Sequence, residues 1–182
     1  RERLALVDLF ISPSKFLREK FIASGMIQSG QIIHSDNGFD LTPFRDVQRI
    51  PGSTLCFGFV GTIAYYKGVH VLAEAFAGID APDVELQIWG DMDTFADYKA
   101  RLDRHLDNPR IKIRGRFDPR DVAKVMAGID VLVVPSLWFE NSPLTIHEAW
   151  MAGIPVIASN RGGMAELVED GVNGLHFEIG NA

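Results

Sequence analysis

The stretch Leu55-Cys56-Phe57-Gly58-Phe59-Val60-Gly61 decides the fold class of this chain. It is an apolar run that ends at a glycine, which is typical of a strand buried on both faces. The segment that follows repeats apolar residues at helical spacing, so one face of a helix would pack on this strand. Those residues are Val69, Leu72, Ala73 and Phe76.

The alternation of short apolar runs with longer helical segments continues to the end of the chain. It predicts an α/β fold with a doubly wound parallel sheet, in which ligands bind beyond the carboxyl ends of the strands. The predicted strands are 55–60, 84–89, 110–114, 130–134, 155–158 and 175–177. Further helices are predicted at 94–106, at 119–127 and from Asn141-Ser142-Pro143 to about Gly153.

The first fifty residues have a different pattern. A strand is predicted at 7–11, a helix at 14–24 and a second short strand at 31–34, before turn residues that begin at Asn37. If the strand at 7–11 was built to pair inside a larger sheet, its exposed edge favours pairing with a second copy of the fragment.

We therefore expect three parts in this chain. Residues 1–36 would be a remnant of a preceding domain, 37–53 a linker and 54–182 the main domain. Because the chain starts without a methionine, we also expect it to be a piece of a longer protein.

Composition limits the partners and the compartment. The chain has 182 residues, a formal net charge of -6 and no basic block, so nucleic acid is not an expected partner. The single cysteine, Cys56, lies in an apolar run, which fits a reducing compartment and leads us to expect a cytoplasmic location. No apolar stretch approaches the ~20 residues of a membrane-spanning helix.

Two carboxylates flank the predicted helix start near residue 141. Glu140 lies in the loop after the strand at 130–134, and Glu148 follows after seven residues, in the second turn of the helix. The free N–H groups of the first turn form an anion site that suits a diphosphate, with the carboxylates accepting hydrogen bonds from sugar hydroxyls. The alternative is a helix capped by Asn141 or Ser142, with both glutamates solvated.

Gly61 and Lys67 follow the strand at 55–60 at the same edge of the predicted sheet. Gly61 permits close approach of a ligand or backbone, and Lys67 supplies a fixed positive charge. The alternative is a tight turn followed by a surface lysine. The stretch matches neither the P-loop nor the Gly-x-Gly-x-x-Gly fingerprint of dinucleotide enzymes.

Four motifs occur in register along the main domain. They are Gly61…Lys67-Gly68, Glu140…Glu148, Ala152-Gly153-Ile154-Pro155-Val156, and Gly162-Gly163-Met164-Ala165-Glu166 with Asp170-Gly171-Val172-Asn173-Gly174. Together they resemble the carboxyl-terminal domain of family 4 retaining glycosyltransferases of the GT-B fold. Residues 12–40 likewise resemble the last strand, helix and linker of that family's amino-terminal domain.

The resemblance implies a Rossmann-like domain, one half of a GT-B fold, that binds a nucleotide-diphospho-sugar without a metal or other cofactor. The sugar would be transferred with retention from a UDP- or GDP-sugar donor. The acceptor would be bound by an amino-terminal domain that is missing here, and any contact with the inner face of the membrane would be made through that domain. The fragment alone would then be inactive.

The resemblance also implies a role for each matching residue. Lys67 would bind the donor diphosphate and Glu148 the ribose hydroxyls. Glu140, with the backbone of Asn141 to Thr145, would contact the donor sugar and phosphates, and Lys67 and Glu140 would be the catalytic residues. The main chain at Arg116 and Phe117 would hold the base. The expected donor site comprises Gly61, Thr62, Lys67, Arg116, Phe117, Glu140, Asn141, Ser142, Pro143, Leu144, Thr145 and Glu148.

Thr62 departs from the family pattern, since many members have an arginine directly after the glycine. One cation is therefore absent from the diphosphate site, which bears on donor affinity. Arg161 is a candidate replacement, and the alternative is an ordinary loop arginine. The five histidines form no recognisable metal motif, so no metal site is expected.

Two other functions remain open from the sequence. A sugar-nucleotide epimerase of the same fold would share the diphosphate site at a helix start, although the spacing of Glu140 and Glu148 favours the transferase. A non-catalytic binding or assembly module is the third hypothesis, but a scaffold needs none of Lys67, Glu140 and Glu148.

Overall fold

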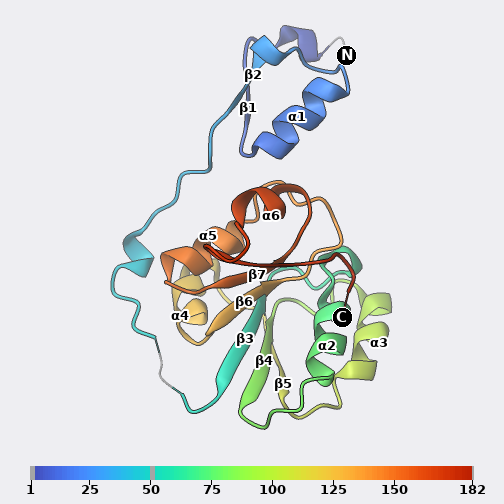
Figure 1. Ribbon diagram of the computed structural model, residues 1–182, viewed down its shortest axis with the longest axis vertical. Coiled ribbons are helices and arrows are strands. Elements are labelled where there is room, and N and C mark those ends of the chain that lie inside the picture. The colour runs from blue at the N-terminus through green and yellow to red at the C-terminus, as the bar shows by residue number, and fades with distance from the viewer. Residues whose placement is uncertain (1–2, 50–51, 182) are drawn as a thin grey trace.

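A six-stranded parallel sheet forms the centre of the computed structural model, which describes residues 3–49 and 52–181 (Figure 1). The strand order is β5-β4-β3-β6-β7-β8, and β3 is hydrogen-bonded to both β4 and β6. This order confirms the predicted doubly wound sheet. The strands are β3 (Leu55–Val60), β4 (Val84–Trp89), β5 (Ile111–Gly115), β6 (Val131–Val134), β7 (Val156–Ser159) and β8 (Gly174–Phe177).

Both faces of β3 are buried, as its apolar run predicts. Phe59 belongs to the core on one side of the sheet, and Val60 belongs to the core on the other side. The first side is covered by α2 (Val69–Ala77) and α3 (Ala96–Leu102), and the second by α4 (Val122–Ala127), α5 (Leu144–Met151) and α6 (Gly162–Leu167). In the described ranges, no helix combines the length and apolar character needed to cross a membrane.

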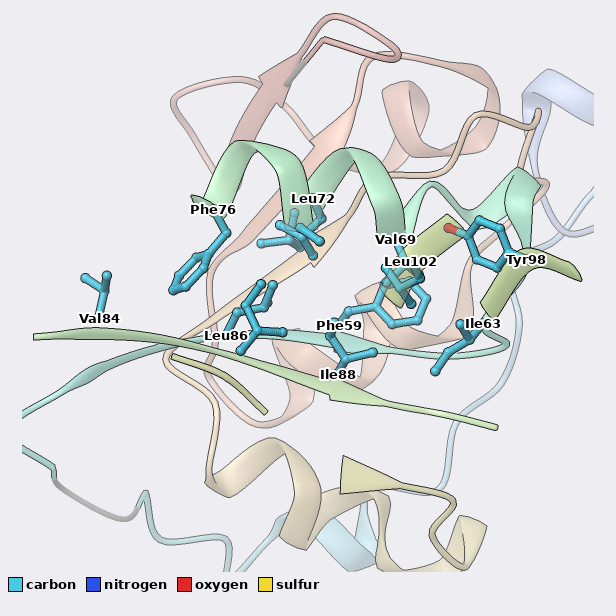
Figure 2. Packing of buried hydrophobic residues seen from close by; sticks show 13 residues of the cluster. Phe59, Ile63, Val69, Leu72, Phe76, Val84, Leu86, Ile88, Tyr98 and Leu102 are labelled. Atoms are coloured by element: carbon cyan, nitrogen blue, oxygen red, sulfur yellow. The ribbon is translucent and has the colours of Figure 1, made fainter. Parts of the chain in front are cut away.

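The helical spacing of apolar residues in α2 has the predicted effect. Val69, Leu72 and Phe76 point from the helix toward the sheet, where they meet Leu86 and Ile88 of β4 (Figure 2). Both β4 side chains are fully buried. This packing fixes the start of α2, and with it the loop from β3 that carries Lys67.

A smaller unit precedes the large sheet. The parallel strands β1 (Phe10–Ser12) and β2 (Ile32–His34) are joined by α1 (Lys15–Ala23), and the unit lies above the carboxyl edge of the large sheet in Figure 1. Short 3-10 helices also occur at Leu4–Leu6, at Ser29–Gln31 and, within the predicted linker, at Thr42–Phe44. The division into a domain remnant, a linker and a main domain stays a prediction, and its residues 1, 2, 50, 51 and 182 lie outside the described residues.

The predicted strand at 7–11 is wrong in its bounds. Leu4–Leu6 forms a 3-10 turn, which the N–H of Val7 closes by donating to the carbonyl of Leu4. The strand begins at Phe10, because pairing starts where Phe10 lies beside Ile32.

In the helices predicted at 94–106 and 119–127, the α-helical part begins later than predicted, at Ala96 and Val122. The side chain of Asp91 accepts hydrogen bonds from the N–H of Asp93 and the hydroxyl of Thr94, which holds this segment as a turn, so α3 begins at Ala96. The helix predicted at 119–127 has a 3-10 first turn, which is capped by the side chain of Asp118.

The helix predicted from Asn141 begins instead at Leu144. Pro143 has an extended backbone, with ψ at 115°, and it provides no side-chain cap. The Asn141 and Ser142 side chains hydrogen-bond to residues outside the helix backbone, so the capping alternative for these two residues is wrong.

Replacement of a fully buried sheet residue tests this architecture. Leu86→Ala is expected to lower the free energy of unfolding by about 2–5 kcal/mol, because it removes buried apolar surface and leaves a cavity. Leu175→Ala, on the half-exposed side chain of β8, is the matched control and should cost less than about 1 kcal/mol. Urea denaturation followed by circular dichroism measures both, and equal losses would contradict the assigned core.

Candidate functional site

A crevice lies at the carboxyl ends of β3, β4, β5 and β6. It consists of a larger cavity of about 550 Å³ and a smaller cavity of about 180 Å³. The two cavities share Val60, Gly61, Thr62 and Thr145 in their walls, so they are parts of one crevice. This is the position at which a doubly wound sheet binds its ligands.

A separate cavity of about 350 Å³ lies between α2 and the sheet. Its lining is apolar apart from Asn181 and includes no charged side chain. Because a reaction or a phosphate needs charged or polar groups, the crevice at the sheet edge is the candidate site.

Lys67 and Glu140 form an ion pair inside the smaller cavity. The Lys67 Nζ lies 2.7 Å from Glu140 Oε1, and the Ser136 hydroxyl donates to the same oxygen at 2.7 Å. The side chain of Glu140 is only 14% exposed and that of Lys67 only 27%. A charged pair that is this well covered keeps more of its Coulombic energy than a surface pair does.

Close packing of two loops positions this pair. Gly68, at φ 70°, follows Lys67, and a side-chain carbon on it would overlap the carbonyl oxygen of Pro135. The carbonyl of Tyr66 accepts a hydrogen bond from the N–H of Leu137, and the Ser136 hydroxyl oxygen lies 3.1 Å from the same carbonyl oxygen. The loop after β3 is therefore fastened to the loop after β6, which fixes Lys67 opposite Glu140.

The amino terminus of α5 forms one wall of the crevice. Leu144 and Thr145 open the helix and line the smaller cavity beside Lys67. The N–H groups of a helix's first turn have no acceptor within the helix, and the helix dipole places partial positive charge there. The smaller cavity thus brings together one ammonium group and a helix amino terminus.

Glu148 lies one turn further along α5 and lines the larger cavity. Burial alone raises the pKa of its carboxyl group. Across the residues that the structure describes, no hydrogen bond or ion pair reaches this carboxylate. An incompletely solvated carboxylate that faces a cavity is a candidate for binding hydroxyl or amino groups of a ligand.

Arg116 and Phe117 form the far wall of the larger cavity, directly after β5. The Arg116 guanidinium pairs with Asp91, and this pairing holds the pKa of the Asp91 carboxyl below its usual range. Phe117 packs edge-on against Trp89, with 5.9 Å between ring centroids. The ion pair and the aromatic contact fix the course of the main chain at 116–117.

The structure brings ten of the twelve expected site residues to the walls of this crevice. The other two are Asn141 and Ser142, whose side chains are directed elsewhere, while the expected role of their backbone stays a prediction. Asn141 accepts a hydrogen bond from the hydroxyl of Ser14, and the Ser142 hydroxyl lies 3.1 Å from Nε2 of His147.

Asp91 and Ser136 belong to the site but were not predicted from the sequence. Each is the second residue after the end of a strand: Gly90 and Asp91 follow β4, and Pro135 and Ser136 follow β6. A polar residue just beyond a buried parallel strand is a usable signal, because all such strand ends meet at one edge.

Thr62 lines both cavities, at the position where the family resemblance led us to expect an arginine. Arg161 does not replace that cation. Its guanidinium carbon lies 3.9 Å from the ring centroid of Phe139, and Arg161 is absent from the walls of both cavities in the described structure. Lys67 is therefore the basic residue of the smaller cavity.

Among residues 3–49 and 52–181, no group of three or more His, Cys, Asp or Glu side chains is placed to hold a metal ion. The ring of His147, next to Glu148, stacks on Phe39, with 4.6 Å between centroids.

Comparisons with known proteins agree with this geometry. The chain is 33% identical over 129 residues to the GDP-mannose-dependent alpha-mannosyltransferase of Corynebacterium glutamicum. This match covers 70% of the chain and 29% of the relative. It is 31% identical over 159 residues to the UDP-Gal:alpha-D-GlcNAc-diphosphoundecaprenol alpha-1,3-galactosyltransferase of Escherichia coli, covering 79% of the chain and 40% of the relative. The chain therefore spans less than half the length of these relatives.

A solved structure gives the same result for the fold. The Anabaena protein HepE, in complex with UDP and glucose, superposes with a TM-score of 0.85 at 27% identity, covering 96% of this chain and 50% of that protein. The sequence profile of the family described as "Glycosyl transferases group 1" matches residues 42–182. The chain thus belongs to the glycosyl transferases group 1 family, and its large sheet is the Rossmann-like half of a GT-B fold.

Proposed function

We propose that residues 54–182 are the donor-binding domain of a glycosyltransferase that transfers a sugar from a nucleotide-diphospho-sugar. The observation that carries the proposal is the crevice itself, where Lys67, Glu140 and the amino terminus of α5 lie beside Glu148, whose carboxylate has no partner within the described part of the chain. The comparisons favour this function over an epimerase, because the named sugar-transferring relatives are a mannosyltransferase and a galactosyltransferase.

The smaller cavity suits the diphosphate. As the bond between sugar and diphosphate breaks, negative charge grows on the leaving oxygen, and Lys67 with the first N–H groups of α5 would stabilise that charge. Because these groups are preorganised by loop packing, we propose that the protein meets this charge without a metal ion. Glu140 would then face the donor sugar.

The larger cavity suits the nucleoside. The carboxylate of Glu148 would accept hydrogen bonds from two ribose hydroxyls, which would offset the cost of its burial. The main chain at Arg116 and Phe117 would contact the base. Both uridine and guanosine donors are candidates, since one relative is named for GDP-mannose and the Anabaena protein binds UDP.

The remaining parts of the reaction come from the family resemblance. We propose that transfer retains the anomeric configuration and that the acceptor is bound by a partner domain outside this chain. We further propose a cytoplasmic location, with any membrane contact made through that partner domain.

Removal of the Lys67 charge tests the diphosphate site. Lys67→Ala is expected to weaken binding of UDP or GDP about tenfold or more, because a charge-assisted contact with the diphosphate is lost. Lys112→Ala removes an exposed lysine of β5 and should leave affinity unchanged. Isothermal titration calorimetry with both nucleotides measures the effect. Equal affinity of the two variants would contradict the assignment of Lys67.

Replacement of Glu148 tests the nucleoside site, because stability and binding should change in opposite directions. The folded-state pKa of Glu148 is raised, so at pH 7 its ionised form opposes folding, and that cost disappears as the pH falls through the folded pKa. Glu148→Gln should therefore raise the free energy of unfolding at pH 7 and have a smaller effect in the acid range.

The same Glu148→Gln variant should weaken binding of UDP or GDP by about tenfold, since an amide accepts ribose hydrogen bonds less strongly than a carboxylate. Urea denaturation at several pH values and calorimetric titration measure the two effects. A variant that is more stable and binds with full affinity would show that Glu148 does not contact the nucleotide.

A further inference from the structure

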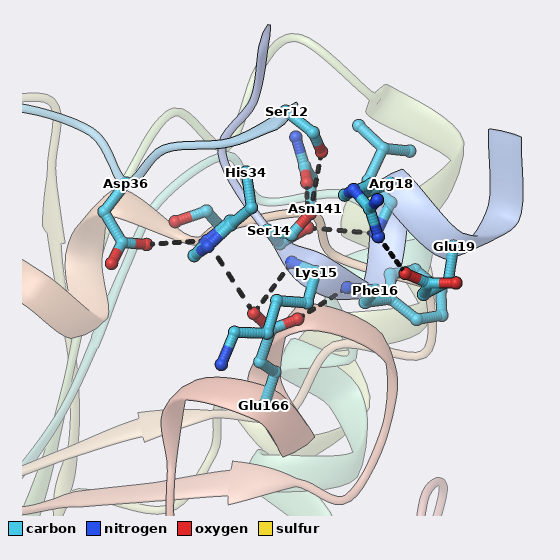
Figure 3. Close-up of polar contacts among 12 residues, drawn as sticks. Ser12, Ser14, Lys15, Phe16, Arg18, Glu19, His34, Asp36, Asn141 and Glu166 are labelled. Atoms are coloured by element: carbon cyan, nitrogen blue, oxygen red, sulfur yellow. Dashed lines mark hydrogen bonds and ion pairs between the residues drawn. The ribbon is translucent and has the colours of Figure 1, made fainter. Parts of the chain in front are cut away.

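The carboxylate of Glu166 in α6 binds the amino terminus of α1, which belongs to the preceding unit (Figure 3). Its two oxygens accept hydrogen bonds from the backbone N–H groups of Lys15, at 2.8 Å, and Phe16, at 2.6 Å. A negative charge at this end of a helix is favoured by the free N–H groups and by the helix dipole. Glu166 therefore joins the two units through residues that are 150 positions apart in the sequence.

The same end of α1 contacts residues 139–142, here called the Glu140 loop. The ring of Phe16 stacks on Phe139, with 5.6 Å between centroids and 12° between planes. The hydroxyl of Ser14, which caps α1, donates to the side chain of Asn141. Lys20 lies over both aromatic rings, at 5.5 and 5.4 Å from their centroids.

On its other side the Glu140 loop rests on the amino terminus of α6. The N–H of Gly163 donates to the carbonyl of Glu140 at 2.7 Å. A side-chain carbon on Gly163 would overlap the carbonyl oxygen of Asn141, so the contact leaves no free space. The loop is thus held between α6 and α1, and Glu166 joins these two helices directly.

We propose that Glu166 is a positioning residue for the Glu140 loop. Because Glu166 binds α1 to α6, it holds the preceding unit against the Glu140 loop. The Glu140 side chain of this loop lies in the crevice and pairs with Lys67. The consequence for ligand binding rests on the proposed function. Among the described residues that join α1, α6 and the Glu140 loop, Glu140 is the one that lines the crevice.

Two titratable groups of the preceding unit lie near Glu166. Nε2 of His34 lies 4.0 Å from Glu166 and 3.3 Å from Asp36. His34 ends β2, and its Nε2 is buried without a hydrogen-bond partner among the described residues, so the two backbone N–H groups of α1 are the hydrogen-bond donors to Glu166 (Figure 3).

The test compares Glu166→Gln with Glu169→Gln in the 182-residue chain. Both changes remove one carboxylate from the same segment, but no hydrogen bond or ion pair to the Glu169 side chain occurs among the described residues. Hydrogen–deuterium exchange would be followed in peptides that cover residues 14–18 and 139–142. UDP and GDP affinities would be measured by calorimetry in parallel.

For Glu166→Gln we expect exchange to accelerate about tenfold in both peptides and nucleotide affinity to fall about three- to tenfold, because the loss of a charge-assisted contact frees α1 and then the loop. Glu169→Gln should change neither. Faster exchange at 14–18 alone, with unchanged exchange at 139–142, would overturn the positioning role. Unchanged exchange in both peptides would overturn the contact as well.

Two further arms keep the test decisive. If Glu166→Gln does not fold, Phe16→Leu removes the ring stacking from the α1 side and should accelerate exchange at 139–142 in the same way. If the unaltered chain binds neither UDP nor GDP, the proposed function fails for this chain, and exchange at 139–142 still decides whether Glu166 positions the loop.

Discussion

Two-sided burial of β3 is the constraint on which the other features depend. Because β3 is paired with β4 on one edge and β6 on the other, the loops that leave β3 and β6 emerge side by side. One loop ends in Lys67 and the other carries Glu140. The chain can bring these two residues together, 73 positions apart, only because the strand order reverses at this point of the sheet.

The electrostatics of the crevice are divided between its two cavities. In the smaller cavity the positive charge of Lys67 is already balanced by Glu140, and Ser136 satisfies the same carboxylate. In the larger cavity, burial raises the pKa of Glu148, and no side chain in residues 3–49 or 52–181 pairs with its carboxylate. In the smaller cavity, Lys67 and the amino terminus of α5 suit an anionic part of a ligand that displaces the Glu140 carboxylate from Lys67. In the larger cavity, the carboxylate of Glu148 suits a hydroxyl-bearing part.

The sequence predicted the parts of the structure that depend on local pattern. The bounds of β3 and β4 were predicted to the residue, because apolar runs and the glycines after them are local signals. The direction of the Asn141 side chain could not be predicted, because it depends on Ser14, more than 100 residues away. Ser142 likewise contacts the distant Asn37, besides His147 five residues along the chain. The contact of Glu166 with α1 is non-local in the same sense, and no periodicity or spacing reports it.

The substitution at Thr62 gives the Lys67–Glu140 pair added importance. Lys67 is the one cationic side chain that lines the smaller cavity in the part of the chain that the structure describes. A diphosphate would therefore have to bind Lys67, and its negative charge would compete with the Glu140 carboxylate that is already bound there. Transfer of Lys67 from Glu140 to the diphosphate would leave the Glu140 carboxylate with Ser136 and free capacity to accept hydrogen bonds from sugar hydroxyls. Lys67 and Glu140 would then each exchange their mutual contact for a contact with the ligand. The cost of breaking the ion pair would be offset by the contact of Lys67 with the diphosphate and of Glu140 with the sugar. Such an exchange requires that the backbone of Glu140 stay in place while its side chain changes partner, and the packing of the loop between α6 and α1 provides that constraint.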